Sequence, residues 1–267
     1  MSKISRFIPI VAVVVLLSAG AVSANHSWGG YHWARRANPF TLMIGDNVTA
    51  AWDSYLTTTI SDWSASSVLD MVRTDGRANP RNCRPTSGRV EVCNSTYGNT
   101  GWLGVAQIWV SGGTHISQGT VKLNDTYFNT STYNSPAWRN LVSCQEVGHT
   151  IGLDHQDENF DNPNLNTCMD YTSNPSSNQY PNQHDYDELE TIYAHLDSTT
   201  TVGSLILPSA MPPAMGDIDP DGPSHWGRLV RSSRDGRSQT FELDFGQGYK
   251  IVTHVLWSDE ALGRGRR

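Results

Sequence analysis

Basic residues are scarce in this chain of 267 residues, in which 19 Lys and Arg stand against 26 Asp and Glu. The resulting formal net charge is −7. Proteins that bind nucleic acid through its phosphates need a basic surface, so we expect no nucleic-acid partner. Hydrophobic residues still make up 37% of the chain, which excludes a disordered protein. The length allows one or two domains with a sizeable core.

Long apolar runs are also rare, and only residues 7–19 form one. A membrane-spanning helix needs about 20 apolar residues, so this run is too short for a typical anchor. Lys3 and Arg6 precede it, and small residues follow it at 22–24, as a cleavage site requires. We therefore predict a secretory signal peptide over residues 1–24, a secreted protein, and no stable membrane association after cleavage. An uncleaved anchor is the alternative.

Cysteines number only four, and none of them belongs to a C-x-x-C pair. A four-cysteine zinc site normally uses such pairs, so the spacing argues against one. An even number of cysteines in an exported chain instead predicts two disulfides, and four cysteines allow three pairings. Pairing between sequence neighbours would join Cys83 to Cys93 and Cys144 to Cys168.

The chain divides by composition into segments, and it contains no internal repeat. Residues 25–198 are rich in aromatic and patterned stretches and form the predicted main domain. Residues 199–223 are rich in Ser, Thr, Pro, Gly and Met, a composition typical of a linker. Residues 224–267 contain alternating and apolar stretches, so we expect a small β-rich extension with two or three strands. This extension could be a separate module or could pack on the main domain.

Within the main domain, hydrophobic periodicity predicts helices and strands that interleave along the chain. Ser135 and Pro136 are a typical helix start, and Gly152 can end that helix in the left-handed conformation. Interleaved strands and helices predict an α+β domain with a mixed β-sheet. We expect helices at 49–64, 136–151 and 184–196 and strands at 68–73, 102–110 and 116–124.

One segment indicates chemistry: residues 145–155 read Q-E-V-G-H-T-I-G-L-D-H. Gln145 and His149 are four residues apart, so they share one face of the predicted helix. Gly152 permits a sharp turn that can bring His155 back towards the same point. The segment, with a C-M-D-Y sequence downstream, resembles the metzincin family of zinc metallopeptidases, whose motif is H-E-x-x-H-x-x-G-x-x-H followed by a Met-turn. Gln145 stands where the family has its first His ligand.

The resemblance implies a fold for residues 25–198, which have the size of a matrixin-type catalytic domain. That fold is zincin-like: a twisted mixed β-sheet with an active-site helix, a Met-turn and a C-terminal helix. The resemblance makes 119–124 the edge strand that lines the substrate cleft and 184–196 the closing helix. It also places the Met-turn beneath the active-site helix, so that Cys144 could meet Cys168.

The resemblance further implies an activity, that of a secreted zinc endopeptidase with a protein or peptide substrate. His149 and His155 would bind zinc as neutral imidazoles. Glu146 would accept a proton from the attacking water and pass it to the leaving amine. Met169 would form an apolar floor beneath the metal, and the polar loop at 172–183 would shape the specificity pocket. We expect the protein to be a monomer.

The amide oxygen of Gln145 is uncharged and a poorer zinc ligand than an imidazole, which leaves three hypotheses. In the first, Gln145 binds zinc weakly and the enzyme works. In the second, another group such as Tyr171 completes the metal shell. In the third, the site has lost its metal, and the chain is a catalytically inactive binding protein on the same fold. We favour the first two, because Glu146, His149 and His155 all keep the pattern of an active site.

Other candidate ligands carry less weight. Asp157, Glu158 and Asp161 could hold calcium, because hard cations bind clustered oxygens. A solvated acidic loop is the alternative, since the spacing fits no EF-hand. The other histidines considered are expected to be polar surface or core residues rather than ligands: His115, His184 and His195.

Overall fold

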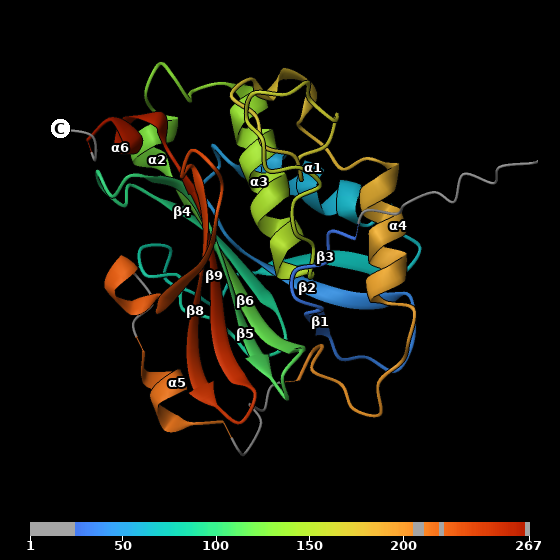
Figure 1. Ribbon diagram of the computed structural model, residues 1–267. Coiled ribbons are helices and arrows are strands. Elements are labelled where there is room, and N and C mark those ends of the chain that lie inside the picture. Colours follow the sequence, from blue (N-terminus) through green and yellow to red (C-terminus); the bar gives the residue numbers. More distant parts are fainter. Residues whose placement is uncertain (1–24, 205–210, 219–221, 265–267) are drawn as a thin grey trace, which may run out of the picture.

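The computed structural model describes residues 25–204, 211–218 and 222–264. The predicted signal peptide and parts of the predicted linker lie outside the described residues. Within the described ranges, no helix is long and apolar enough to cross a membrane. The elements of this part of the chain are arranged around one β-sheet (Figure 1).

Nine strands form the sheet within the described residues. They are β1 (His32–Trp33), β2 (Phe40–Asn47), β3 (Leu69–Asp75), β4 (Val90–Ser95), β5 (Trp102–Ser111), β6 (His115–Asn124), β7 (Arg228–Ser232), β8 (Ser238–Gly246) and β9 (Tyr249–Trp257). The α-helices are α1 (Asp53–Trp63), α2 (Asp125–Phe128), α3 (Pro136–Thr150), α4 (Gln183–Ile192), α5 (Pro213–Asp217) and α6 (Asp259–Arg264). Two short 3-10 helices are η1 (Pro175–Ser177) and η2 (Pro223–His225).

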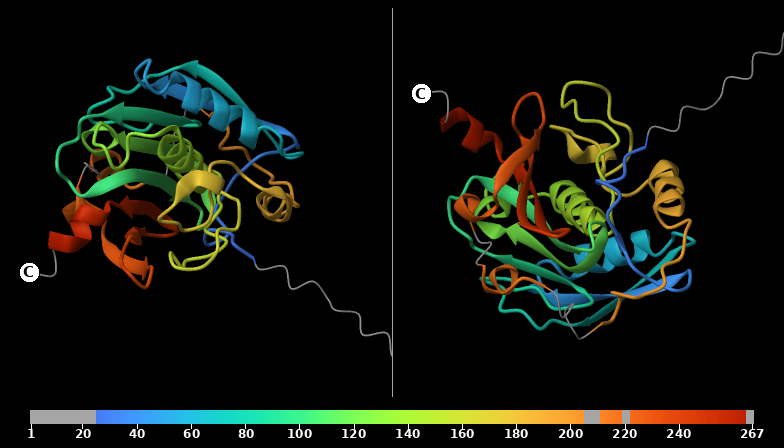
Figure 2. Two further views of the ribbon diagram at one scale, coloured as in Figure 1. Left: turned by 90° about the horizontal axis from the view of Figure 1, so that it is seen from above. Right: turned by 60° about the horizontal axis from the view of Figure 1, so that its bottom comes forward.

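The strand order is β3-β2-β4-β6-β5-β9-β8-β7, and β1 pairs with β6 outside this path. Strands β3, β2, β4 and β6 pair in parallel, whereas β5, β9, β8 and β7 pair antiparallel with their neighbours. Helix α3 packs on β5 and β6, and α1 packs on α3 and β3 (Figure 2). The expected fold class, an α+β domain with a large mixed sheet and helices, is therefore confirmed.

The main core lies between the sheet and these helices. Ile108 and Val110 of β5 face it, together with Val147 of α3. Trp109, between the two β5 residues, points to the opposite face of the sheet, where it packs with Met215 of α5. This alternation follows from the two-residue period of a strand. Because both faces of β5 are covered, the strand forms an almost uninterrupted apolar run in the sequence.

Most predicted elements are present, with shifted ends. Helix α3 begins as expected, with the Ser135 hydroxyl accepting a hydrogen bond from the backbone N–H of Trp138 at 3.3 Å. Helix α1 begins at Asp53 rather than at residue 49, and α4 ends at Ile192 rather than at 196. Periodicity does not reveal β2 or β4. In β4, five consecutive residues are buried, including the charged Glu91, so burial along this strand does not follow the apolar–polar alternation of its sequence.

The expectation that residues 119–124 form an edge strand is wrong. They lie on β6, which pairs with β4 on one side and with β5 on the other. The outer side of β5 is not open either, because β9 pairs with it and places His254 opposite Ala106. Strands β5 and β6 form a hairpin, and local sequence does not reveal which strand of a hairpin lies outside. The strands expected within 224–267 are β7, β8 and β9, and they continue the main sheet.

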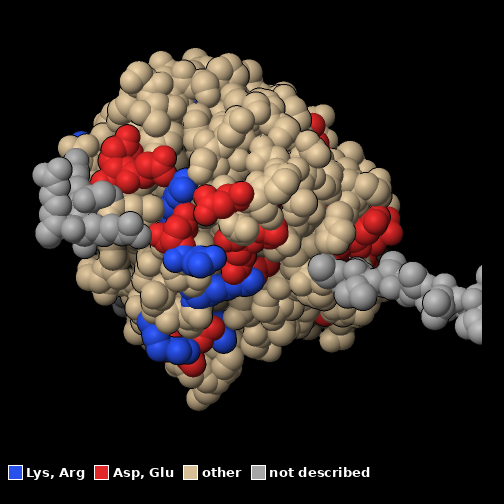
Figure 3. Space-filling view, turned by 45° about the horizontal axis from the view of Figure 1, so that its top comes forward, with Lys and Arg blue, Asp and Glu red and all other residues tan. Residues whose placement is uncertain are grey.

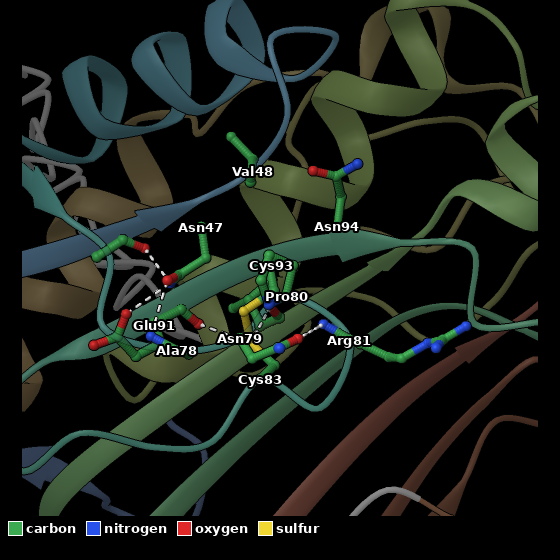
Figure 4. The surroundings of a disulfide bond; sticks show 12 residues. Asn47, Val48, Ala78, Asn79, Pro80, Arg81, Cys83, Glu91, Cys93 and Asn94 are labelled. Carbon is green, nitrogen blue, oxygen red and sulfur yellow. Dashed lines mark hydrogen bonds between the residues drawn. A yellow bond between two sulfur atoms is a disulfide. The ribbon is translucent and has the colours of Figure 1, made fainter.

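Two disulfides join Cys83 to Cys93 and Cys144 to Cys168, which confirms the pairing of sequence neighbours. The first ties the loop before β4 to that strand (Figure 4). The second ties α3 to the residue that precedes Met169. Two disulfides are consistent with an extracellular protein.

Candidate metal centre

Helix α3 and the turn after it bring His149 and His155 together. The helix ends at Thr150, and Gly152 then adopts a φ of +96°, in the left-handed region. A Cβ at this position would lie 2.1 Å from the backbone oxygen of Tyr31, so only glycine fits both the conformation and the space. The reversed chain places the ring centroids of His149 and His155 4.6 Å apart.

Both imidazoles are buried, and their Nε2 atoms have no hydrogen-bond partner within the described residues. The Nδ1 of His149 lies 2.9 Å from the carbonyl oxygen of Leu153. A carbonyl only accepts, so Nδ1 carries the proton and Nε2 presents a lone pair. Burial lowers the pKa of His149 to about 3 and the pKa of His155 well below its usual value. Both rings are therefore neutral near pH 7, the form in which imidazole binds metals.

A third histidine, His254, joins this cluster from β9. Its ring centroid lies 4.0 Å from that of His149 and 4.9 Å from that of His155. One ring nitrogen of each residue lies within 4.8 Å of the others, and all three residues are buried. Local sequence does not reveal His254 as a ligand, because a lone histidine in an apolar strand has no ligand signature. Only the pairing of β9 with β5 brings it to the motif.

Glu146 lies beside the three rings. Its Oε2 is 3.0 Å from the Nδ1 of His254, and its Oε1 has no hydrogen-bond partner among the described residues. Burial raises the pKa of Glu146 to about 8, against the opposing effects of His149 and of the backbone N–H of Ala106. A carboxyl with such a pKa exchanges protons near neutral pH, as general acid–base catalysis requires.

A chain of hydrogen bonds holds the other nitrogen of His254. Its Nε2 lies 2.9 Å from the Oγ of Ser238, which in turn accepts a hydrogen bond from the hydroxyl of Tyr171. Tyr171 also packs against His155, with ring centroids 4.1 Å apart. Ser238 lies on β8, so the C-terminal strands supply both His254 and its support. Tyr171 borders the cluster, and its role as a metal ligand stays a prediction.

The side chain of Gln145 extends from α3 to the segment that contains Cys168 and Met169. Its Nε2 donates a hydrogen bond to the carbonyl oxygen of Cys168 at 2.8 Å. Its Oε1 is buried and has no hydrogen-bond partner within the described part of the chain. A buried amide oxygen is costly unless a donor or a cation meets it. This oxygen therefore lacks a partner where one is expected, and its role as a metal ligand stays a prediction.

Met169 packs directly against the helix that carries the motif. A Cβ added at Gly148 would lie 2.6 Å from the Sδ of Met169, so the absence of a side chain at Gly148 permits this close approach. The disulfide between Cys144 and Cys168 joins the same two segments. The segment around Met169 and helix α3 are thus held together by packing and by a covalent bond.

The cluster is closed to solvent. Glu146 is 0% exposed, and the three histidines are 1–5% exposed.

Next to the cluster, Arg231 of β7 forms ion pairs with both Asp154 and Glu158, which link the C-terminal strands to the motif loop. Figure 3 shows one face of the molecule on which basic and acidic side chains lie next to one another, as paired charges do.

The acidic residues considered for calcium make contacts of their own. Asp157 accepts a hydrogen bond from the side-chain amide of Asn162 at 2.8 Å. Glu158 pairs with Arg231, and the backbone N–H of Asp161 donates to the Asn159 side chain at 3.0 Å. These contacts do not test calcium binding, which stays a prediction.

The sequence matches no protein-family model and shows no significant similarity to a curated protein. Among solved structures, one match is high choriolytic enzyme 1, a hatching-enzyme zinc protease from the medaka fish Oryzias latipes. The two chains are 9% identical, and the match covers 61% of this chain and 94% of that chain with a TM-score of 0.33. The case for a metal centre in this chain therefore rests on the geometry of His149, His155 and His254.

Proposed function

We propose that this chain is a secreted zinc endopeptidase of the metzincin type, in which His254 joins His149 and His155 around the metal. The observation that carries the proposal is the buried group of three imidazoles beside Glu146. Zinc prefers nitrogen ligands in a near-tetrahedral shell, and a catalytic site has three protein ligands and one further position. Two unpaired Nε2 lone pairs fit that requirement, together with the Nδ1 of His254, which would exchange its contact with Glu146 for the metal.

The residues around the cluster have distinct roles in this proposal. A bound zinc ion would supply Lewis acidity, which polarises a peptide carbonyl and activates water near neutral pH. Glu146 would accept the proton of the water at its unpaired Oε1 and return it to the leaving amine. Ser238 and Tyr171 would orient His254 through their hydrogen bonds.

We further propose that the form described here is latent. A peptide has no access to the cluster, because its side chains are at most 5% exposed. Strand β9 lies along β5, where an extended substrate could otherwise pair with the sheet. Release of β7–β9 would open that side of β5 and remove His254 from the metal. The unpaired Oε1 of Gln145 would then be the group available as a third protein ligand.

The metal part of the proposal is tested by zinc analysis of two matched variants of the full chain. We expect His254→Ala to bind zinc at the buried cluster less tightly than the native chain in a chelator competition, because one of three imidazoles is removed. We expect His225→Ala, which removes an exposed histidine of η2, to keep the zinc affinity of the native chain. Equal zinc affinity in His254→Ala and the native chain would exclude His254 as a ligand.

The catalytic part is tested by hydrolysis of an unfolded protein substrate by the zinc-loaded chain. We expect turnover to rise after a protease that cuts within residues 199–223 releases the C-terminal strands. Glu146→Gln should keep the zinc and lose turnover on the order of a hundredfold or more after the same treatment. A zinc-loaded chain that hydrolyses nothing before or after release would instead support the inactive binding protein.

A further inference from the structure

A second group of potential ligands shares no residue with the first. His32 lies on β1, and His195 and Asp197 follow the end of α4. One ligand atom of each of these three residues lies within 4.8 Å of the others. The parallel pairing of β1 with β6 places His115 opposite His32. Segments that are far apart in the sequence therefore meet around the carboxylate of Asp197.

The distances among the three ligand atoms match those of a zinc shell. The Nε2 atoms of His32 and His195 are 3.1 Å apart. The Oδ1 of Asp197 lies 3.6 Å from the Nε2 of His32 and 3.7 Å from that of His195. Zinc bonds of about 2.0–2.1 Å in a tetrahedron require ligand atoms about 3.3 Å apart. The three atoms thus form a triangle close to one face of such a tetrahedron.

Further contacts orient each of these groups. The Nδ1 of His32 lies 2.9 Å from the carbonyl oxygen of Gly30, so Nδ1 carries the proton and Nε2 presents its lone pair to the group. Arg35 donates to the Oδ2 of Asp197 from its Nη1 at 3.1 Å and from its backbone N at 3.2 Å. These bonds leave Oδ1 directed at the histidines. The Nη2 of Arg35 also donates to the carbonyl oxygen of His195.

We propose that His32, His195 and Asp197 form a second metal site, which binds zinc and fastens β1 to the segment after α4. Two imidazoles and one carboxylate are ligands that zinc accepts, with a fourth position for water. The side chain of His195 is 53% exposed, so an ion can enter without unfolding of the protein. His115, with its Nε2 3.2 Å from Oδ1 of Asp197, acts as a positioning residue for the carboxylate.

The site is independent of the proposed peptidase activity, and zinc analysis of the full chain tests it. We expect His195→Ala to bind one zinc ion fewer than the native chain, while the matched control His225→Ala binds as many as the native chain. His195→Ala is suited to this test because the side chain it removes is largely outside the core. We expect His254→Ala to keep the zinc at this second site, so failure of one site does not imply failure of the other.

A second variant tests the orientation of the carboxylate. His115→Ala should weaken zinc binding at this site by about 10- to 100-fold in a chelator competition, the usual effect of losing a group that orients a ligand. Cobalt in place of zinc should give a visible spectrum that His195→Ala changes and His225→Ala does not. The four side chains could instead form only a hydrogen-bond network around Asp197. In that case His195→Ala would bind as much zinc, as tightly, as the native chain, and the proposal would be overturned.

Discussion

The disulfide between Cys144 and Cys168 should stabilise both the fold and the buried metal cluster. Its sequence separation is 24, so the closed loop corresponds to about 3.5 kcal/mol of unfolding free energy in the chain-entropy treatment. The separation between Cys83 and Cys93 is 10, and the same treatment assigns that bridge about 2.8 kcal/mol. The two bridges are therefore expected to contribute similarly to stability, which makes one a matched control for the other.

The bridges differ in what they hold. Cys144 directly precedes Gln145 on α3, and the carbonyl oxygen of Cys168 accepts the hydrogen bond from that side chain. Met169, the next residue, packs against the helix at Gly148. Replacing Cys144 and Cys168 together by Ala frees these segments to separate. This change should lower zinc affinity at the buried cluster as well as the unfolding free energy.

Urea unfolding of the metal-free proteins measures the loss of unfolding free energy. Chelator competition measures the loss of zinc affinity. The double Ala variant at Cys83 and Cys93 should lose similar unfolding free energy and keep the zinc affinity of the native chain. Equal zinc affinity in the two double variants would refute the idea that the Cys144–Cys168 bridge supports the metal cluster. Intact stability in both would refute the chain-entropy reasoning.

Three further substitutions test particular contacts. Gly148→Ala places a Cβ 2.6 Å from the Sδ of Met169. The overpacking cost of about 1–3 kcal/mol should exceed the gain of about 1 kcal/mol from higher helix propensity, so the Tm should fall. An unchanged or higher Tm would contradict this. Arg139→Met removes a guanidinium that lies 4.7 Å above the Trp52 ring and donates to a buried carbonyl oxygen. Urea unfolding should therefore show that the unfolding free energy falls by about 2 kcal/mol. An unchanged unfolding free energy would mean that these contacts contribute nothing. Burial raises the pKa of Asp62, so the folded state binds the carboxyl proton more tightly than the unfolded state. The stability that Asp62 contributes therefore falls as the pH rises from its pKa in the unfolded state to its higher pKa in the folded state. Asp62→Asn should flatten this part of the stability–pH curve in titrated unfolding experiments, and an unaltered slope would exclude Asp62 as its source.

Local sequence predicts the half of the candidate site that lies on α3. The cap at Ser135, the spacing of Gln145 and His149, and the turn at Gly152 all act over a few residues, so they are visible in the sequence. The disulfide partner of Cys144 is also its nearest cysteine in the sequence, one of the three pairings that the sequence allows. These features depend on helical period and turn chemistry, which do not need the rest of the fold.

The remainder depends on pairing between distant segments. His254 meets the motif because β9 lies in register with β5, and no local pattern encodes that register. His32, His195 and Asp197 converge only through the packing of β1 and of the segment after α4. The mistaken edge assignment of residues 119–124 has the same origin, because strand order in a sheet is a property of the whole fold.

The position of His254 also has a consequence for biosynthesis. His149 and His155 leave the ribosome about a hundred residues before β9 is complete, since chains emerge from the N-terminal end. The earlier strands of the sheet can pair first. Pairing of β9 with β5 forms slowly, because the long stretch of chain between them must close into a loop before any contact is made. A nascent or truncated chain would thus carry two of the three imidazoles and leave β5 uncovered. Zinc capture by three histidines becomes possible only after β9 has been synthesised and has paired with β5, so metal loading would report that this pairing has formed.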